Sequence, residues 1–134
     1  MLKRNAGPLI CIVHDDDSVR RRMDRLLRSV GSRTSVFDSS AAFLRSYHTQ
    51  TISCLIVDAD MTGVSGLRLQ RMLADAHIPI PIVLVTPAAD VIRAAAYAHG
   101  AVAVLRIPFT DKELLSAVTT ALTSSERDTM NQHG

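Results

Sequence analysis

Residues 54–67 read CLIVDADMTGVSGL, and the first half of this stretch decides the fold class. Residues 54–57 form a short, continuous apolar run without alternation of polar and apolar positions. Such runs are typical of strands buried on both faces of a parallel sheet. Asp58 follows directly, so a carboxylate stands at the predicted carboxyl end of a buried strand.

Similar apolar runs recur on both sides of this stretch, at residues 9–13, 80–85 and 101–105, with a weaker strand at 34–37. Helical spacing of apolar residues separates them. The predicted helices are one that spans residues 19–30 and ends at Gly31, then 41–47 after Ser39, 67–76 after Ser65, 88–98 before Gly100, and 114–122 after a Thr110–Glu113 capping box. Repeated strand–helix units predict an α/β three-layer sandwich with right-handed crossovers and a binding crevice at the carboxyl ends of the strands.

The composition excludes several classes of protein. A chain of 134 residues with 15 Lys+Arg, 13 Asp+Glu and 47% hydrophobic residues fits one globular domain. The net charge of +2 and the absence of Trp argue against nucleic-acid binding. No apolar run approaches the roughly 20 residues of a membrane span, and the start of the chain has no secretory core. Cys11 and Cys54 lie inside apolar runs, so we expect a reduced, cytoplasmic protein.

Chemically active side chains follow the predicted strands. The first strand ends in His14, Asp15, Asp16 and Asp17, and later strands end in Asp58, Thr86 and Arg106. Carboxylates that converge from separate strands repel one another unless a cation is present, and an all-oxygen ligand set favours Mg²⁺ over zinc. For Asp16 and Asp17 the alternative of helix N-capping is preferred, because both precede a helix.

The order of these motifs resembles the response-regulator receiver domains of two-component signalling, in particular the FixJ-like branch. The match covers residues 9–122. It rests on HDDDSVRRRMDRLLRSVG, LIVDADMTGVSGL with Thr62 in place of proline, IPIVLVTPAAD, and GAVAVLRIPFTDKELLSAV. The resemblance implies a flavodoxin-like (βα)5 fold with strand order 2-1-3-4-5, a receiver domain over residues 1–124 and a flexible tail over 125–134.

The resemblance also implies roles for individual residues. Asp58 would accept a phosphoryl group from a histidine kinase, a phosphotransfer protein or a small phosphodonor. Mg²⁺ would be held by Asp15, Asp58 and the main-chain carbonyl of Asp60, and Thr86 would hydrogen-bond a phosphoryl oxygen. The chain would then be a signalling module and not an enzyme.

Besides Thr62, three positions depart from the family pattern. Without gaps, the first member of the family's acidic pair falls on His14; a one-residue deletion would instead make Asp15 and Asp16 the pair. The family's lysine falls on Ile107, and the neighbouring Arg106 can replace it only if the strand end is bulged. The aromatic residue of the family's switch falls on Val104.

The departures leave His14 with two interpretations. A protonated His14 would oppose the metal and make its binding depend on pH, whereas a neutral ring would only cap the strand end with one hydrogen bond. With neutral His14, Asp15 and Asp58 sum to a charge of −2, which equals the sum of three carboxylates and one lysine. The arginines of the first helix, Arg20, Arg21, Arg22, Arg25 and Arg28, form either a solvated face or a docking surface for a kinase.

Three functions remain open on the sequence. The first is a phosphorelay receiver that alters partner binding through its fourth helix and fifth strand. Its effector is unknown. A homodimer through the fourth helix, fifth strand and fifth helix is left open. No helix-turn-helix fits after Leu122, so direct DNA binding is not expected. The second is a degenerate receiver that binds partners without phosphorylation. The third, a small Mg²⁺-dependent phosphatase, would use Asp60 as general acid but lacks a lysine and a cap domain.

Overall fold

A computed structural model describes residues 7–46 and 51–133, with side chains described through residue 124. Strands and helices alternate along the chain. Their bounds are β1 (Leu9–Val13), α1 (Asp17–Ser29), β2 (Arg33–Phe37), α2 (Ser40–Ser46), β3 (Cys54–Asp58), α3 (Gly66–Asp75), β4 (Ile82–Thr86), α4 (Ala89–Ala98), β5 (Ala103–Arg106) and α5 (Asp111–His133). The predicted end of α2 at residue 47, the first six residues and Gly134 lie outside the described part of the chain.

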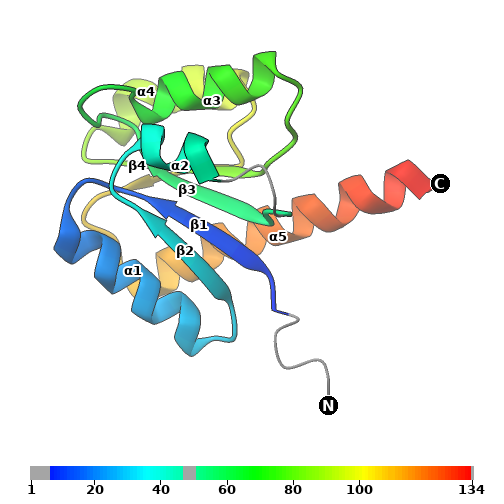
Figure 1. Cartoon of the computed structure of the whole chain (residues 1–134), viewed down its shortest axis with the longest axis horizontal. Helices are drawn as coiled ribbons and strands as arrows, with labels where there is room; N and C mark the ends of the chain where they lie inside the picture. Colours follow the sequence, from blue (N-terminus) through cyan, green and yellow to red (C-terminus); the bar gives the residue numbers. More distant parts are fainter. Residues whose placement is uncertain (1–6, 47–50, 134) are drawn as a thin grey trace.

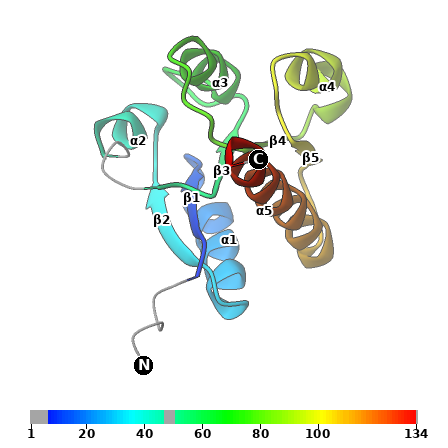
Figure 2. The same cartoon turned by 90° about the vertical axis from the view of Figure 1, so that its right-hand side faces the viewer.

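The five strands form one parallel sheet in the order β2-β1-β3-β4-β5, as the resemblance implies. Helices α1 and α5 cover one face, and α2, α3 and α4 cover the other (Figures 1 and 2). The central strands β1, β3 and β4 are buried along their whole length. The three-layer α/β sandwich predicted from the apolar runs is therefore confirmed.

Two apolar cores lie on opposite faces of the sheet because successive side chains of a strand point to opposite sides. Cys11, Leu55 and Leu84 face the core under α2, α3 and α4. Ile12 and Ile56 face the core under α1 and α5. Each fully buried aliphatic side chain contributes about 1.5–3 kcal/mol, so the two cores hold the strand ends in place for a site.

Helix ends follow the predicted capping residues. Asp16 accepts hydrogen bonds from Ser18 N and Val19 N at the start of α1, and Ser65 accepts one from Arg68 N at the start of α3. At α5 the capping box forms in both directions, with Thr110 N to Glu113 Oε1 at 2.8 Å and Glu113 N to Thr110 Oγ1 at 3.1 Å. Gly31 follows α1 with a φ of +95°, as a C-terminal glycine should.

The end of α5 differs from the sequence prediction. The sequence predicts that the helix ends at residue 122, whereas the helical backbone continues through His133 and runs past the sheet (Figure 1). The flexible tail expected over residues 125–134 stays a prediction. Neither Gly nor Pro occurs between Asp111 and His133. No such breaker therefore interrupts α5, and each further residue adds one helical hydrogen bond.

Candidate functional site

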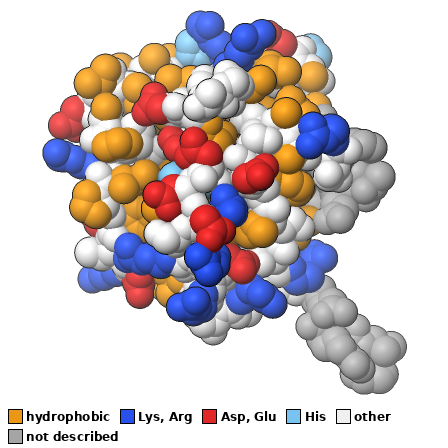
Figure 3. Space-filling view, turned by 60° about the vertical axis from the view of Figure 1, so that its left-hand side comes forward, with side chains coloured by type: hydrophobic (Ala, Val, Ile, Leu, Met, Phe, Trp, Pro, Cys, Tyr) orange, Lys and Arg blue, Asp and Glu red, His pale blue; other side chains and the backbone are white. Residues whose placement is uncertain are grey.

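The carboxyl ends of the strands bring His14, Asp15, Asp58 and Thr86 to one edge of the sheet, as predicted. His14 and Asp15 follow β1, Asp58 ends β3, and Thr86 ends β4. Figure 3 brings the left-hand side of Figure 1 forward, and on this face acidic side chains gather near the middle while most basic ones lie toward the border. Parallel pairing of β1, β3 and β4 is what places residues distant in sequence beside one another.

Asp58 is a buried carboxylate with two differently placed oxygens. Its side chain is 13% exposed. Oδ1 accepts the backbone N–H of Asp60 at 2.9 Å, whereas Oδ2 lies 3.5 Å from Nε2 of His14. Burial raises the pKa of Asp58, and the charges of Asp15 and Asp60 raise it further, while the Asp60 N–H and the His14 ring oppose the rise. Such a carboxylate is stabilised by a cation.

Thr86 is fully buried, and its hydroxyl is engaged with the loop after β3. Oγ1 donates to Oδ2 of Asp60 at 2.9 Å and accepts the backbone N–H of Ala88 at 3.0 Å. The contact with the Asp60 carboxylate was outside the sequence prediction, which considered this side chain only as a phosphatase acid. The signal was its position two residues after the strand, within reach of the neighbouring strand end.

His14 caps the end of β1. It is 4% exposed, and its Nδ1 accepts the backbone N–H of Asp16 at 3.0 Å. Arg20 fixes the same turn by donating from Nη1 to the His14 carbonyl at 2.6 Å. The single hydrogen bond at the strand end, one of the two interpretations of this residue, is therefore present.

The three aspartates after His14 divide between two roles. Asp16 caps α1, and its pKa is lowered, first by the hydrogen bond from the Val19 N–H. Asp17 pairs with Arg20 at 2.6 Å and with Arg21 at 2.5 Å. Asp15 is exposed, with Oδ1 3.7 Å from Nδ1 of His14. Asp16 and Asp17 thus belong to the helix, and only Asp15 is left for the cluster.

His14, Asp15 and Asp58 form the group that can hold a metal within the part of the chain with described side chains. One potential ligand atom from each lies within 4.8 Å of the others. The two carboxylate oxygens fit Mg²⁺, which prefers hard oxygen ligands and retains several waters. His14 adds no oxygen. The donor set therefore fits Mg²⁺ through the two carboxylates of Asp15 and Asp58, where the family pattern has three.

Arg106 on β5 does not replace the family's lysine at the site. β5 pairs with β4 in unbroken register up to Thr86 and Arg106, so the bulge that would turn Arg106 inward is absent. Arg106 is exposed, and Ile107 packs against the core under α1 and α5. Val104 is buried on the opposite face. The structure therefore shows neither basic nor aromatic side chain of the family's usual kind here.

Gly66 joins the site to α3. A Cβ on this residue would collide with the carbonyl oxygen of Asp58 and lie 2.8 Å from its carbonyl carbon. Only glycine permits the helix to start so close to the end of β3.

The sequence and the fold are similar to those of known proteins. The family model described as the response regulator receiver domain matches residues 10–119. The chain belongs to the response regulator receiver family. This receiver domain is 40% identical over 121 residues to nodulation protein W of Bradyrhizobium diazoefficiens, which covers 90% of the chain and 52% of that protein. It is 38% identical over 115 residues to the response regulator protein TmoT of Ectopseudomonas mendocina, covering 85% of the chain and 52% of TmoT. The chain spans about half the length of these curated relatives.

Solved structures agree with the fold. The response regulator StyR superposes with a TM-score of 0.87 at 33% identity, over 95% of this receiver domain and 65% of the StyR chain. The FixJ-N structure superposes with a TM-score of 0.80 at 27% identity, over 87% of this chain and 94% of its own. The resemblance inferred from the sequence motifs is thereby confirmed at the level of family and fold.

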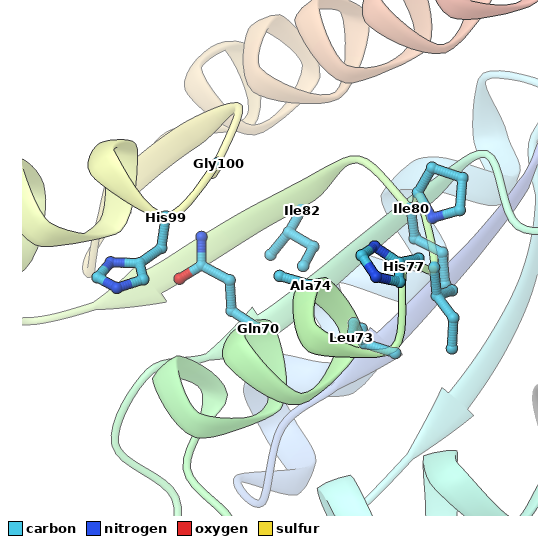
Figure 4. A pocket seen from close by; sticks show the side chains of 10 residues that line it. Gln70, Leu73, Ala74, His77, Ile80, Ile82, His99 and Gly100 are labelled. Carbon is cyan, nitrogen blue, oxygen red and sulfur yellow. The ribbon is translucent and has the colours of Figure 1, made fainter.

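Two other surfaces of the receiver domain are defined by the structure. A pocket of about 410 Å³ lies between α3 and α4, with Gln70 and His99 near one end and His77 near the other (Figure 4). No acidic residue lines it, so it is separate from the carboxylate site.

On α1, most of the arginines pair with aspartates, and Arg22 donates to Phe109 O and Asp111. Among the described helices, none has the length and apolar character to cross a membrane.

Proposed function

We propose that this receiver domain accepts a phosphoryl group on Asp58 in two-component signalling. The observation that carries the proposal is the arrangement of the Asp58 carboxylate. One oxygen is held by the Asp60 N–H, and the other faces the cluster of His14 and Asp15. A buried strand-end carboxylate with one oxygen oriented by the backbone and the other unbonded is suited to in-line attack on phosphorus.

Asp15 and Asp58 would hold Mg²⁺, with the Asp60 carbonyl as the third protein ligand that the family resemblance suggests. The ion would neutralise charge on the incoming phosphoryl group. The chain's own residues orient the acceptor: Asp60 N–H holds Oδ1, and the two sheet cores hold the strand. The Thr86 hydroxyl, which donates to Asp60 in this structure, would exchange that partner for a phosphoryl oxygen.

The proposed donors are a histidine kinase or a phosphotransfer protein, and the proposed readout is binding to an effector or to a second copy of this chain. Exposed apolar side chains on α4, Val91 at 82% and Tyr97 at 45% exposure, support such a readout at the α4–β5–α5 surface. Because Cys11 and Cys54 are free thiols in the core, we place the protein in the reducing cytoplasm.

The second candidate is a receiver that binds partners without phosphorylation. It is favoured by one observation: Ile107 packs into the core, and Arg106 is held outward by regular pairing with β4. No cation then reaches the phosphoryl position from β5.

Intact-mass spectrometry after incubation with acetyl phosphate distinguishes the two candidates. We expect a Mg²⁺-dependent phosphoryl adduct on the wild type and none on Asp58→Asn, which preserves shape and an acceptor for the Asp60 N–H. Asp15→Asn should weaken Mg²⁺ binding, so that the adduct forms only at a higher Mg²⁺ concentration. Asp17→Asn is the matched control, because it removes an exposed carboxylate at the start of α1 that pairs with arginines of the same helix. A folded wild type that takes no phosphoryl group from acetyl phosphate or a cognate kinase would refute the first candidate and favour the second.

A further inference from the structure

The ring of His14 is oriented by a contact that determines which nitrogen carries a proton. A backbone N–H can only donate, so the 3.0 Å contact from Asp16 N makes Nδ1 an acceptor. In a neutral imidazole the other nitrogen then bears the hydrogen. His14 is therefore the Nε2–H form.

This Nε2–H is a donor without an acceptor. Nε2 is buried and has no hydrogen-bond partner within the described residues. It is directed at the unbonded oxygen of Asp58, Oδ2, but at 3.5 Å it is too far for a good hydrogen bond. Burying an unsatisfied donor costs free energy, so the arrangement suits an additional acceptor brought between Nε2 and Asp58.

The same tautomer prevents His14 from acting as a metal ligand through Nε2. A ligating nitrogen must offer a lone pair, and this one is used by the N–H bond. Moving the hydrogen to Nδ1 would break the contact with Asp16 N that caps the strand. The ring therefore contributes a donor to the site while Asp15 and Asp58 contribute the carboxylates.

We propose that His14 Nε2–H donates a hydrogen bond to the phosphoryl group on Asp58, in place of the missing cation at Ile107. The inference rests on the proposed function, since it names a residue that assists the same transfer. During transfer from acetyl phosphate, an Asp58 oxygen forms the new P–O bond while the P–O bond to acetate breaks. Acetate leaves with the bonding electron pair, and the hydrogen remains on Nε2.

His14→Asn and His14→Gln separate donation from capping. Asn places an amide oxygen near the position of Nδ1, which retains the cap on the Asp16 N–H but removes the distal donor. Gln places an amide N–H near the position of Nε2, which retains the donor but removes the cap. We expect Asn to slow phosphorylation by acetyl phosphate about ten- to hundredfold and Gln to stay within a fewfold of the wild type. A role in stability alone would reverse this order, because Gln loses the cap.

Long-range ¹⁵N spectra of the histidine rings provide a readout that needs no phosphorylation. We expect a protonated Nε2 and a bare Nδ1 for His14 in the metal-free protein. A protonated Nδ1 with a bare Nε2 would overturn the inference directly. Equal phosphorylation rates for the wild type and a folded His14→Asn would also overturn it while leaving the proposed function intact. A wild type that takes no phosphoryl group under any donor would overturn both.

Discussion

Replacing Gly66 with alanine tests the close packing of α3 on the end of strand β3. Helix propensity alone predicts that Gly66→Ala stabilises the protein by up to about 1 kcal/mol. The structure predicts the opposite sign, because the new methyl group would collide with the Asp58 carbonyl oxygen and lie 2.8 Å from the carbonyl carbon. Both atoms belong to the backbone of a buried strand, so relief requires movement of β3 or α3.

Forcing one extra carbon into a packed site costs about 1–3 kcal/mol. For a domain of this size, each kcal/mol corresponds to roughly 3–5 °C in Tm. We therefore expect a fall of about 3–15 °C in Tm, measured by differential scanning calorimetry, together with shifted amide resonances at Asp58 and Ala59.

Gly63→Ala is the matched control in the same loop. Gly63 has a φ of +83°, and nothing lies within 4 Å of its added Cβ. Backbone strain alone should lower the free energy of unfolding of Gly63→Ala by about 1–2 kcal/mol. The amide resonance of Asp58 should stay in place. A Gly66→Ala variant that is as stable as the wild type, or more so, would refute the packing described for this loop.

Three further predictions follow from other parts of the structure. Asp16→Ala should destabilise α1 by about 1 kcal/mol in urea denaturation, because it removes the acceptor at the helix start; an unchanged midpoint would contradict the capping. Burial raises the pKa of Cys11 to about 11 and of Cys54 to about 12. Both thiols therefore stay protonated at pH 8 and should resist Ellman's reagent until the protein unfolds. The free energy of unfolding should fall as the pH rises above the ordinary thiol pKa of 9.0 toward these values, since the native state retains protons that the unfolded state releases. His14→Asp should tighten Mg²⁺ binding about tenfold in calorimetric titration, because a unit charge about 5 Å from a divalent ion in water contributes about 1.7 kcal/mol; unchanged affinity would place the metal elsewhere.

Much of the fold could be predicted because its signals are local. Five apolar runs and their capping residues gave the order of strands and helices, and the residues that end the strands gave the carboxylate cluster. The runs at 80–85 and 101–105 begin earlier than the strands they predict. Ile80 packs against the core without pairing in the sheet, and Pro81 has no N–H for the ladder. At these positions a residue is apolar because it faces the core, although it does not belong to a strand.

The orientation of side chains in the site could not be predicted in this way. Whether Thr86 turns to Asp58 or to Asp60, and which nitrogen of His14 is protonated, depends on contacts between neighbouring loops and not on spacing along the chain. The outward course of Arg106 likewise depends on the register of β5 with β4, which its sequence alone leaves free. The role of His14 remains a proposal that the variants above test.

The hydroxyl of Thr86 has a single hydrogen, and in this structure Asp60 holds it. A phosphoryl oxygen on Asp58 and the Asp60 carboxylate are therefore mutually exclusive partners for that hydrogen. The exchange replaces one hydrogen bond with another, so it costs little, and the exposed Asp60 is solvated once released. Occupation of Asp58 would thus leave Asp60, two residues away, with an oxygen that no longer accepts from Thr86. A partner's donor could then bind that oxygen in one state only, without any movement of the sheet.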